Sequence, residues 1–190
     1  MKYVITGSLG NISKPVSEKL IKAGHEVTII TSKEANRAAI EAIGAKAAIG
    51  SIEDAAFVSE TFTGADVVYL MIPPNMAVTN WLAWQQKIAD NYVAAIITNN
   101  IKKVVQLSSI GAHLRKGTGP VDGLGYLEEQ LSDLKDTDAK FLRPSYFFYN
   151  LHGMAPLIKG MNIMGSNFGD TDEKLVLVHT NDIADVFLKN

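Results

Sequence analysis

Apolar and amphipathic segments alternate from the first residues of the chain. Tyr3–Thr6 is a short apolar run that ends at a glycine, and Glu26–Thr31 is a second apolar run. Between them, Val16, Leu20 and Ala23 recur at helical spacing. The first 31 residues therefore predict a strand, a helix and a second strand in that order.

The same alternation continues through the remaining chain. We expect further strands at residues 47–49, 66–72, 103–107, 140–142 and 175–178. We expect further helices at residues 33–43, 54–62, 77–99, 126–134 and 182–188, with a glycine-rich loop at 111–125. Strands that are apolar throughout and separated by helices are typical of a parallel sheet covered on both faces. The pattern predicts a single α/β domain over residues 1–190, with a doubly wound, Rossmann-like parallel sheet.

Composition excludes several classes of function. Apolar residues make up 47% and charged residues 20% of the 190 residues, which is typical of a globular domain. The net charge of −2 gives no reason to expect nucleic acid or an anionic membrane as a partner, so we expect a small-molecule substrate. The absence of cysteine excludes disulfides, thiolate metal sites and a cysteine nucleophile, and the four histidines lack metal-ligand spacing.

The N-terminal sequence leads directly into the first predicted strand. No charged, apolar and cleavage-site pattern of a signal peptide precedes Tyr3. The longest apolar run, residues 65–74, is too short to span a bilayer. A cytoplasmic location is the resulting prediction.

A glycine-rich turn joins the first strand to the first helix. Gly7 suits the tight turn, and Gly10 lets backbone N–H groups approach a pyrophosphate at the start of the helix. Ser13 stands where a third glycine is usual, and it is small enough to pack closely and to cap the helix. The turn predicts an NAD(P) site, and the alternative is a structural turn without a ligand. The predicted cofactor-binding residues here are Gly7, Ser8, Leu9, Gly10, Asn11 and Ile12.

The end of the second strand bears on the choice between NAD and NADP. An acidic residue there would bind the ribose 2′-hydroxyl, whereas basic residues accommodate a 2′-phosphate. The chain has Ser32 and Lys33 at this point and Arg37 one turn later, although Glu34 follows closely. We expect these three residues to bind the cofactor and to favour NADP; the alternative is that the two cations are solvated surface charges.

Several motifs together resemble one family. They are Thr6–Ile12, Gly50–Asp54, Gly64–Tyr69, Leu107–Ala112, Gly117–Pro120, Leu142–Ser145 with Asn150, and Asp182–Ala184. In this order they make the chain similar to the NmrA-like branch of the atypical short-chain dehydrogenases, over essentially its whole length.

The resemblance implies further cofactor contacts. Ser51 and Ile52 would lie against the adenine, Ile72 and Pro73 beside the cofactor, and Ser108 with Ser109 at the nicotinamide end. Pro144 would continue the floor of the site. Members usually extend beyond the region of Asp182, so the resemblance also implies that residues 145–190 form part of a substrate-binding region. Homodimers through the helices at 77–99 and 126–134 are a further implication.

The catalytic residues are less defined than the cofactor site. Carbonyl-reducing members of the wider family typically use a tyrosine followed four residues later by a lysine. Tyr126 has this spacing, but Gln130 supplies no positive charge, and a second alignment matches Glu128 to a family glutamate instead. Tyr126 as acid and Ser109 as orienting group for a substrate carbonyl are the candidates. Their alternatives are a packed tyrosine at the start of a helix and a serine that bonds backbone.

Aromatic residues suggest the substrate class. The run from Tyr146 to Tyr149 is expected either to wall an apolar pocket or to fill the core. Trp81 and Trp84 could line an acceptor pocket, form part of a dimer face or anchor the core. We expect an oxidoreductase that acts on a small quinone-like or aromatic acceptor. The alternatives are a non-catalytic NAD(P)-sensing regulator and, with less support, a sugar-nucleotide epimerase.

Overall fold

The fold is built on one six-stranded sheet, in which all described pairings are parallel. The computed structural model describes residues 1–164 and 174–188. The strand order is β3-β2-β1-β4-β5-β6. The strands are β1 (Lys2–Ile5), β2 (Glu26–Thr31), β3 (Lys46–Ile49), β4 (Val67–Leu70), β5 (Lys103–Leu107) and β6 (Asp138–Leu142). In the register, Tyr3 lies opposite Val27 on one side and Val67 on the other. The predicted doubly wound sheet is confirmed.

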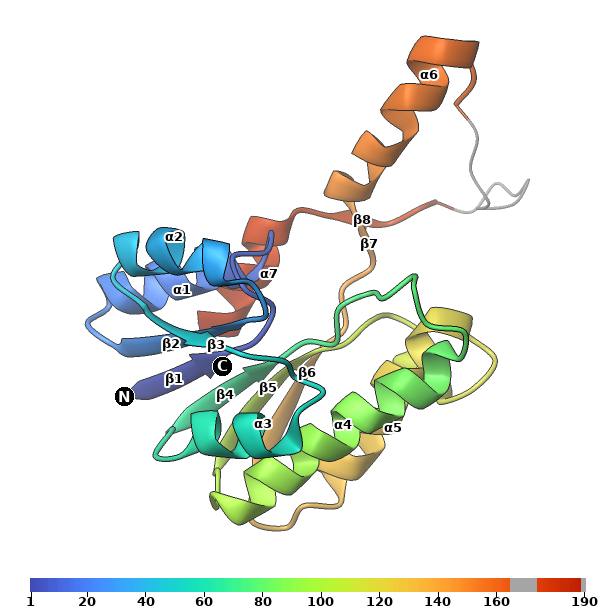
Figure 1. The fold of residues 1–190 in the computed structure, drawn as a ribbon. Helices are drawn as coiled ribbons and strands as arrows, with labels where there is room; N and C mark the ends of the chain where they lie inside the picture. Colours follow the sequence, from blue (N-terminus) through green and yellow to red (C-terminus); the bar gives the residue numbers. More distant parts are fainter. Residues whose placement is uncertain (165–173, 189–190) are drawn as a thin grey trace.

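Helices cover both faces of this sheet (Figure 1). One face carries α1 (Ser13–Lys22), α2 (Arg37–Ala42) and α7 (Thr180–Leu188). The other carries α3 (Ala55–Phe62), α4 (Trp81–Thr98) and α5 (Asp122–Ser132). Short 3-10 turns are η1 (Glu34–Asn36), η2 (Ala112–Leu114), η3 (Gly119–Val121) and η4 (Phe148–Met154). None of these described helices is long and apolar enough to cross a membrane.

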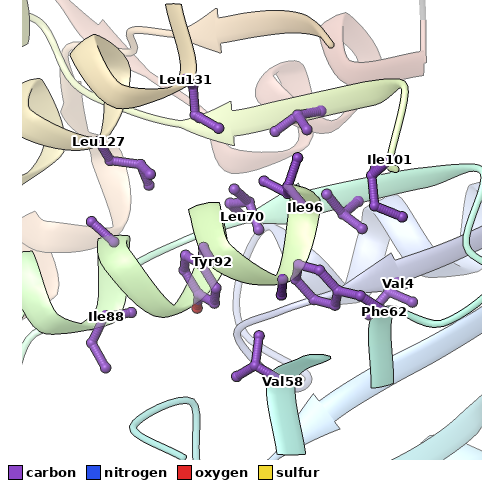
Figure 2. Close-up of a cluster of buried hydrophobic side chains, with 14 of the residues drawn as sticks. Val4, Val58, Phe62, Leu70, Ile88, Tyr92, Ile96, Ile101, Leu127 and Leu131 are labelled. Atoms are coloured by element: carbon purple, nitrogen blue, oxygen red, sulfur yellow. The ribbon is translucent and has the colours of Figure 1, made fainter. Parts of the chain in front are cut away.

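Two apolar clusters, one on each face, explain why the strands are apolar throughout. Successive strand residues point to opposite faces, so Val4 packs against the α3–α5 side and Ile5 against the α1 side. Val68 and Tyr69 alternate in the same way. Figure 2 shows the α3–α5 cluster, in which Tyr92 of α4 lies among side chains from the neighbouring elements. Both faces of the sheet are therefore buried, as expected for a parallel sheet.

Three predicted boundaries differ from the structure for local reasons. The helix expected from residue 77 begins at Trp81, because the Asn80 side chain accepts a hydrogen bond from the Ala83 amide and caps it. The helix expected at 126–134 begins at Asp122 and contains Gly123 and Gly125, which were expected in a loop. The segment expected to be helical from residue 33 starts as the 3-10 turn η1.

Packing explains the two glycines inside α5. A Cβ atom on Gly123 would lie 2.4 Å from the Gln85 Cβ atom, and one on Gly125 would lie 2.4 Å from the Ala112 carbonyl oxygen. Both distances are far below van der Waals contact, so these positions need glycine for the close approach of α5 to its neighbours. The glycines do not end the helix.

The segment after β6 forms a separate small unit. Strand β7 (Tyr146–Phe147) pairs in parallel with β8 (Leu177–Val178), outside the main sheet. The strand expected at 175–178 is therefore present but shorter, and its partner β7 was not predicted as a strand. Helix α6 (Ala155–Met161) extends away from the sheet, and α7 returns to lie beside α1 (Figure 1).

Candidate functional site

The site lies where the chain leaves β1 and β4 in opposite directions. In an open parallel sheet this reversal creates a crevice at the carboxyl ends of the strands. Thr6 connects the two strand ends, because its hydroxyl accepts a 2.7 Å hydrogen bond from the Met71 amide and its own amide donates to the Tyr69 carbonyl at 3.1 Å. The turn after β1 is thus held directly against the segment after β4.

Gly7 meets a geometric requirement that other residues would not meet. Its φ is +91°, and a Cβ atom there would lie 2.7 Å from the Met71 Cγ atom and 2.8 Å from the Ser13 Oγ atom. Gly10 continues the turn by donating from its amide to the Gly7 carbonyl at 3.2 Å. A compact glycine turn of this kind fits the approach of a pyrophosphate to backbone amides.

The start of α1 has no side-chain cap, because the N-cap residue Ile12 makes no such bond. The Lys14 amide donates to the Gly10 carbonyl at 3.0 Å and Pro15 has no N–H, so any backbone donors for a ligand must come from the turn before them. The expectation that Ser13 caps the helix is wrong, because its hydroxyl donates to the Thr6 carbonyl at 2.9 Å. Its predicted close packing against the turn is confirmed by that same contact.

A cavity of about 400 Å³ adjoins this turn. Seven of the predicted cofactor-binding residues line it: Gly7, Ser8, Ser32, Lys33, Ser51, Ile52 and Pro73. Thr31, Asn36, Asn75 and Trp84 also line it, and of these the sequence analysis named only Trp84 as a pocket candidate. The lining carboxylate, Glu53, pairs with Lys87 at 3.3 Å.

A neutral hydrogen-bonded cluster closes this cavity at the end of β2. The Asn36 amide nitrogen donates to the hydroxyls of Ser8 at 3.0 Å and Thr31 at 2.9 Å. Ser8 in turn donates to the Thr31 hydroxyl at 3.1 Å. Ser8 has a φ of +55°, which is uncommon for serine, and these bonds together with its amide bond to the Ile30 carbonyl hold it there.

Other predicted cofactor residues lie outside the cavity lining. Ile12 is buried in the cluster on the α1 side, and Leu9 packs against that cluster. Gly10 and Asn11 belong to the turn without lining the cavity. Arg37 is held by Glu34, with its Nε and Nη2 atoms 2.5 Å and 3.1 Å from the two carboxylate oxygens. The structure therefore does not bring Arg37 into the cavity.

A second, larger cavity of about 660 Å³ adjoins the first, and Met71 and Pro74 line both. Four predicted residues line it: Ile72, Ser108, Ser109 and Pro144. Its other lining residues are mostly apolar or aromatic: Trp81, Leu107, Ile110, Pro120, Val121, Leu124, Tyr146, Phe147, Leu175 and Val176, with Gln85, Ser145, Asn150 and Lys174 as the polar ones. Of the predicted aromatic run, Tyr146 and Phe147 wall a cavity and the exposed Phe148 and Tyr149 do not.

Polar side chains beneath this cavity fix its floor. Ser108, at the end of β5, donates to the Glu128 carboxylate at 2.5 Å. Arg143 donates to both oxygens of that carboxylate, from Nε at 2.9 Å and from Nη2 at 2.5 Å. Gln85 of α4 donates to the Pro120 carbonyl at 2.9 Å. These bonds join α4, α5, β5 and the end of β6 around the larger cavity.

Tyr126 lies apart from both cavities. Its hydroxyl donates to the Asp90 carboxylate of α4 at 2.9 Å, and that hydrogen bond raises the pKa of Tyr126 above its ordinary value. Its ring packs beside the α3–α5 core cluster. Ser109 lines the larger cavity and Tyr126 does not, so the role of Tyr126 as catalytic acid stays a prediction. In the described part of the chain, no cluster of acidic or histidine side chains has the arrangement of a metal site.

Comparison with known proteins identifies the family. A family model described as NAD(P)H-binding matches residues 7–189. This chain belongs to the NAD(P)H-binding family. No curated protein matches this family member in sequence.

Solved structures show the same fold at low identity to this NAD(P)H-binding protein. The NADPH-dependent quinone oxidoreductase QOR2 of Escherichia coli, solved with NADPH, has a TM-score of 0.80 at 20% identity, over 96% of this chain and 62% of that one. A nucleoside-diphosphate-sugar epimerase of Staphylococcus aureus has a TM-score of 0.79 at 17% identity, over 100% and 67%. The Bordetella bronchiseptica enzyme WbmH, solved with NAD+, has a TM-score of 0.74 at 18% identity, over 99% and 71%. The chain thus spans less than two thirds of the length of the E. coli oxidoreductase.

Proposed function

We propose that this NAD(P)H-binding chain is an oxidoreductase domain of the NmrA-like type, with a small quinone-like or aromatic acceptor. The observation that supports it best is the large apolar cavity beside the cofactor cleft. The two cavities share Met71 and Pro74, so a ring bound in the larger one would lie next to the dinucleotide.

The side chains of the larger cavity favour an acceptor that needs no protein acid. Among its described lining residues, Tyr146 and Lys174 are the titratable ones, and none is Asp, Glu or His. A bound nicotinamide supplies the hydride. A quinone that accepts it takes up one proton from solvent to become the hydroquinone, so a tyrosine–lysine pair is not required. The apolar walls would hold the ring and exclude water from it.

The unit after β6 has a role in this proposal. Tyr146 and Phe147 of β7 and the neighbouring Lys174–Val176 segment line the cavity opposite α4. We therefore assign residues 145–190 to acceptor binding, with residues 165–173 and 189–190 of that range outside the described structure. NADPH is the preferred cofactor in this proposal, because Lys33 lines the smaller cavity and no carboxylate from the end of β2 does.

A cofactor-oxidation assay tests the activity. We expect the purified chain to oxidise NADPH in the presence of benzoquinone or menadione, measured by the loss of NADPH absorbance, and to be inactive with aliphatic aldehydes. Ser109→Ala is expected to lower kcat by roughly tenfold if the serine orients the acceptor. Binding of NADPH without reduction of any quinone would contradict the oxidoreductase proposal.

A non-catalytic cofactor sensor is the second candidate. The position of Tyr126 outside the cavity and the exposed apolar side chains of α6, among them Leu157, Ile158 and Met161, support it. Pull-down with and without NADPH separates the two: a partner captured only in one condition, from a chain inactive with quinones, would favour the sensor. An epimerase has less support, because it normally needs the tyrosine–lysine pair. Here Gln130 stands in the place of the lysine, and Tyr126 does not line the larger cavity.

A further inference from the structure

Cofactor choice at the end of β2 depends on groups that the glycine turn does not include. Ser8, Thr31 and Asn36 form the neutral cluster described above, and with Lys33 they line the adenosine side of the smaller cavity. Hydroxyl and amide groups of this kind can hydrogen-bond a ribose hydroxyl or a phosphate oxygen. The cluster itself therefore does not select one cofactor over the other.

Arg37 is the next cation in sequence after Lys33 and could add selectivity for a phosphate, but two carboxylates surround it. Glu34 contacts Nε at 2.5 Å and Nη2 at 3.1 Å, and Glu41 lies 3.7 Å from Nη1. Neither Arg37 nor Glu34 lines the cavity, although Asn36, between them in sequence, does. Glu34 thus binds the guanidinium bidentately outside the cavity lining, in the geometry that a guanidinium also uses for a phosphate.

The contact is one that a ligand can displace. The side chains of Arg37 and Glu34 are 44% and 67% exposed, and exposed ion pairs contribute little to stability. A 2′-phosphate could therefore recruit Arg37, but it would have to compete with Glu34 and bind near its charge. A 2′-hydroxyl would encounter no such competition.

We propose that Glu34 is a specificity-determining residue, which holds Arg37 away from the adenosine side of the cavity and so allows the chain to use both NADPH and NADH. This inference rests on the dinucleotide site of the proposed function. It predicts that the preference of the natural chain for NADPH, which Lys33 supports, stays modest because Glu34 competes with the 2′-phosphate for the Arg37 guanidinium.

Binding measurements on matched variants test it. Calorimetric titration of Glu34→Gln is expected to show about fivefold tighter NADPH binding, with NADH binding unchanged within about twofold. Glu41→Gln removes the same charge from the same guanidinium but has a single, longer contact, so its effect on NADPH is expected to be at most half as large on a logarithmic scale. Both variants lie on the exposed surface, so both are expected to fold.

A double-mutant cycle gives the sharper result. Arg37→Met alone is expected to change NADPH affinity by less than about twofold, whereas in the Glu34→Gln background it should remove the whole gain. Equal gains in Glu34→Gln and Glu41→Gln, or a gain for NADH as large as for NADPH, would overturn the inference alone. Failure of the natural chain to bind either cofactor would overturn the dinucleotide site and the inference together.

Discussion

The Ser108 hydroxyl and the Glu128 carboxylate lie 2.5 Å apart, in a hydrogen bond that joins the end of β5 to α5. Arg143, directly before Pro144, donates to both oxygens of this carboxylate, including the one that accepts from Ser108. The Glu128 side chain is only 7% exposed, while that of Arg143 is 42% exposed. Ser109 and Pro144, which line the larger cavity, each follow a member of this group, so the buried carboxylate supports the floor of that cavity.

Removal of the buried carboxylate should destabilise the protein. Glu128→Ala is expected to lower the free energy of unfolding by about 2–3 kcal/mol, because Ser108 and Arg143 lose a buried partner. Glu129→Ala is the matched control, since the adjacent Glu129 pairs with Arg115 at the surface and should cost less than about 1 kcal/mol. Urea denaturation measures both. Equal, small losses in the two variants would show that the buried group does not support the floor.

The placement of Tyr126 predicts that its hydroxyl is dispensable for turnover. Tyr126→Phe loses the hydrogen bond to Asp90 on the surface between α4 and α5. We expect kcat for quinone reduction to change by less than about twofold and the free energy of unfolding to fall by about 1 kcal/mol or less. Steady-state kinetics with NADPH and a quinone checks this. A loss of kcat above about a hundredfold would restore Tyr126 as the catalytic acid.

Stability should fall at alkaline pH because of buried tyrosines. Burial raises the pKa of Tyr69 and Tyr92 well above the ordinary value, whereas both ionise near pH ~10 in the unfolded chain. Their contribution to stability is therefore complete below pH ~10 and is lost as the pH rises further, by up to about 1.4 kcal/mol per pH unit for each tyrosine.

Urea denaturation at several alkaline pH values measures this slope. Tyr92→Phe loses the hydrogen bond to the Met71 carbonyl at 3.0 Å, so it should be less stable at neutral pH. Its loss of unfolding free energy per pH unit should be smaller than that of the natural chain by the contribution of one tyrosine. Tyr149→Phe is the control, because Tyr149 is exposed and should leave the slope unchanged. Identical slopes in all three proteins would contradict the burial of an un-ionised Tyr92.

The contact between α4 and α5 should not tolerate a side chain at Gly123. Gly123→Ala is expected to cost about 2 kcal/mol, because the new Cβ atom would overlap Gln85. Combination with Gln85→Gly, which also removes the Cβ atom at 2.4 Å, should cost less than the sum of the two single changes. Gly160→Ala, in the exposed helix α6 with no atom near its Cβ position, should be neutral or slightly stabilising. Additive losses in the double variant would argue against a direct contact.

Periodicity predicts the parts of this fold that depend on local pattern. The continuous apolar strands and the helical spacing of Val16 and Leu20 were sufficient for the parallel sheet, and the glycine turn after Thr6 lies beside the smaller cavity. The turn works as a local signal because Gly7 needs both a positive φ and the absence of a side chain. Both requirements concern residues within one β-α-β unit and the strand beside it.

Contacts between distant residues account for what the pattern did not predict. Gly123 and Gly125 have the composition of a loop, and only their packing against Gln85 and Ala112 shows why they lie in a helix. The engagement of Tyr126 by Asp90, 36 residues earlier in the chain, likewise has no sequence signal. The Glu34–Arg37 contact is local and has the spacing of a helical ion pair, so charge spacing could have indicated it.

Backbone groups around Gly7 are expected to bind the cofactor, and calorimetric titration of NADPH into three proteins measures whether they do. Gly24 is the matched control for Gly7, because it has a φ of +82° but no atom within 4 Å of its Cβ position. We predict that the natural chain and Gly24→Ala bind NADPH with affinities within about twofold, while Gly7→Ala binds at least about tenfold more weakly. Equal affinity in Gly7→Ala and Gly24→Ala, or no binding by the natural chain, would contradict the account.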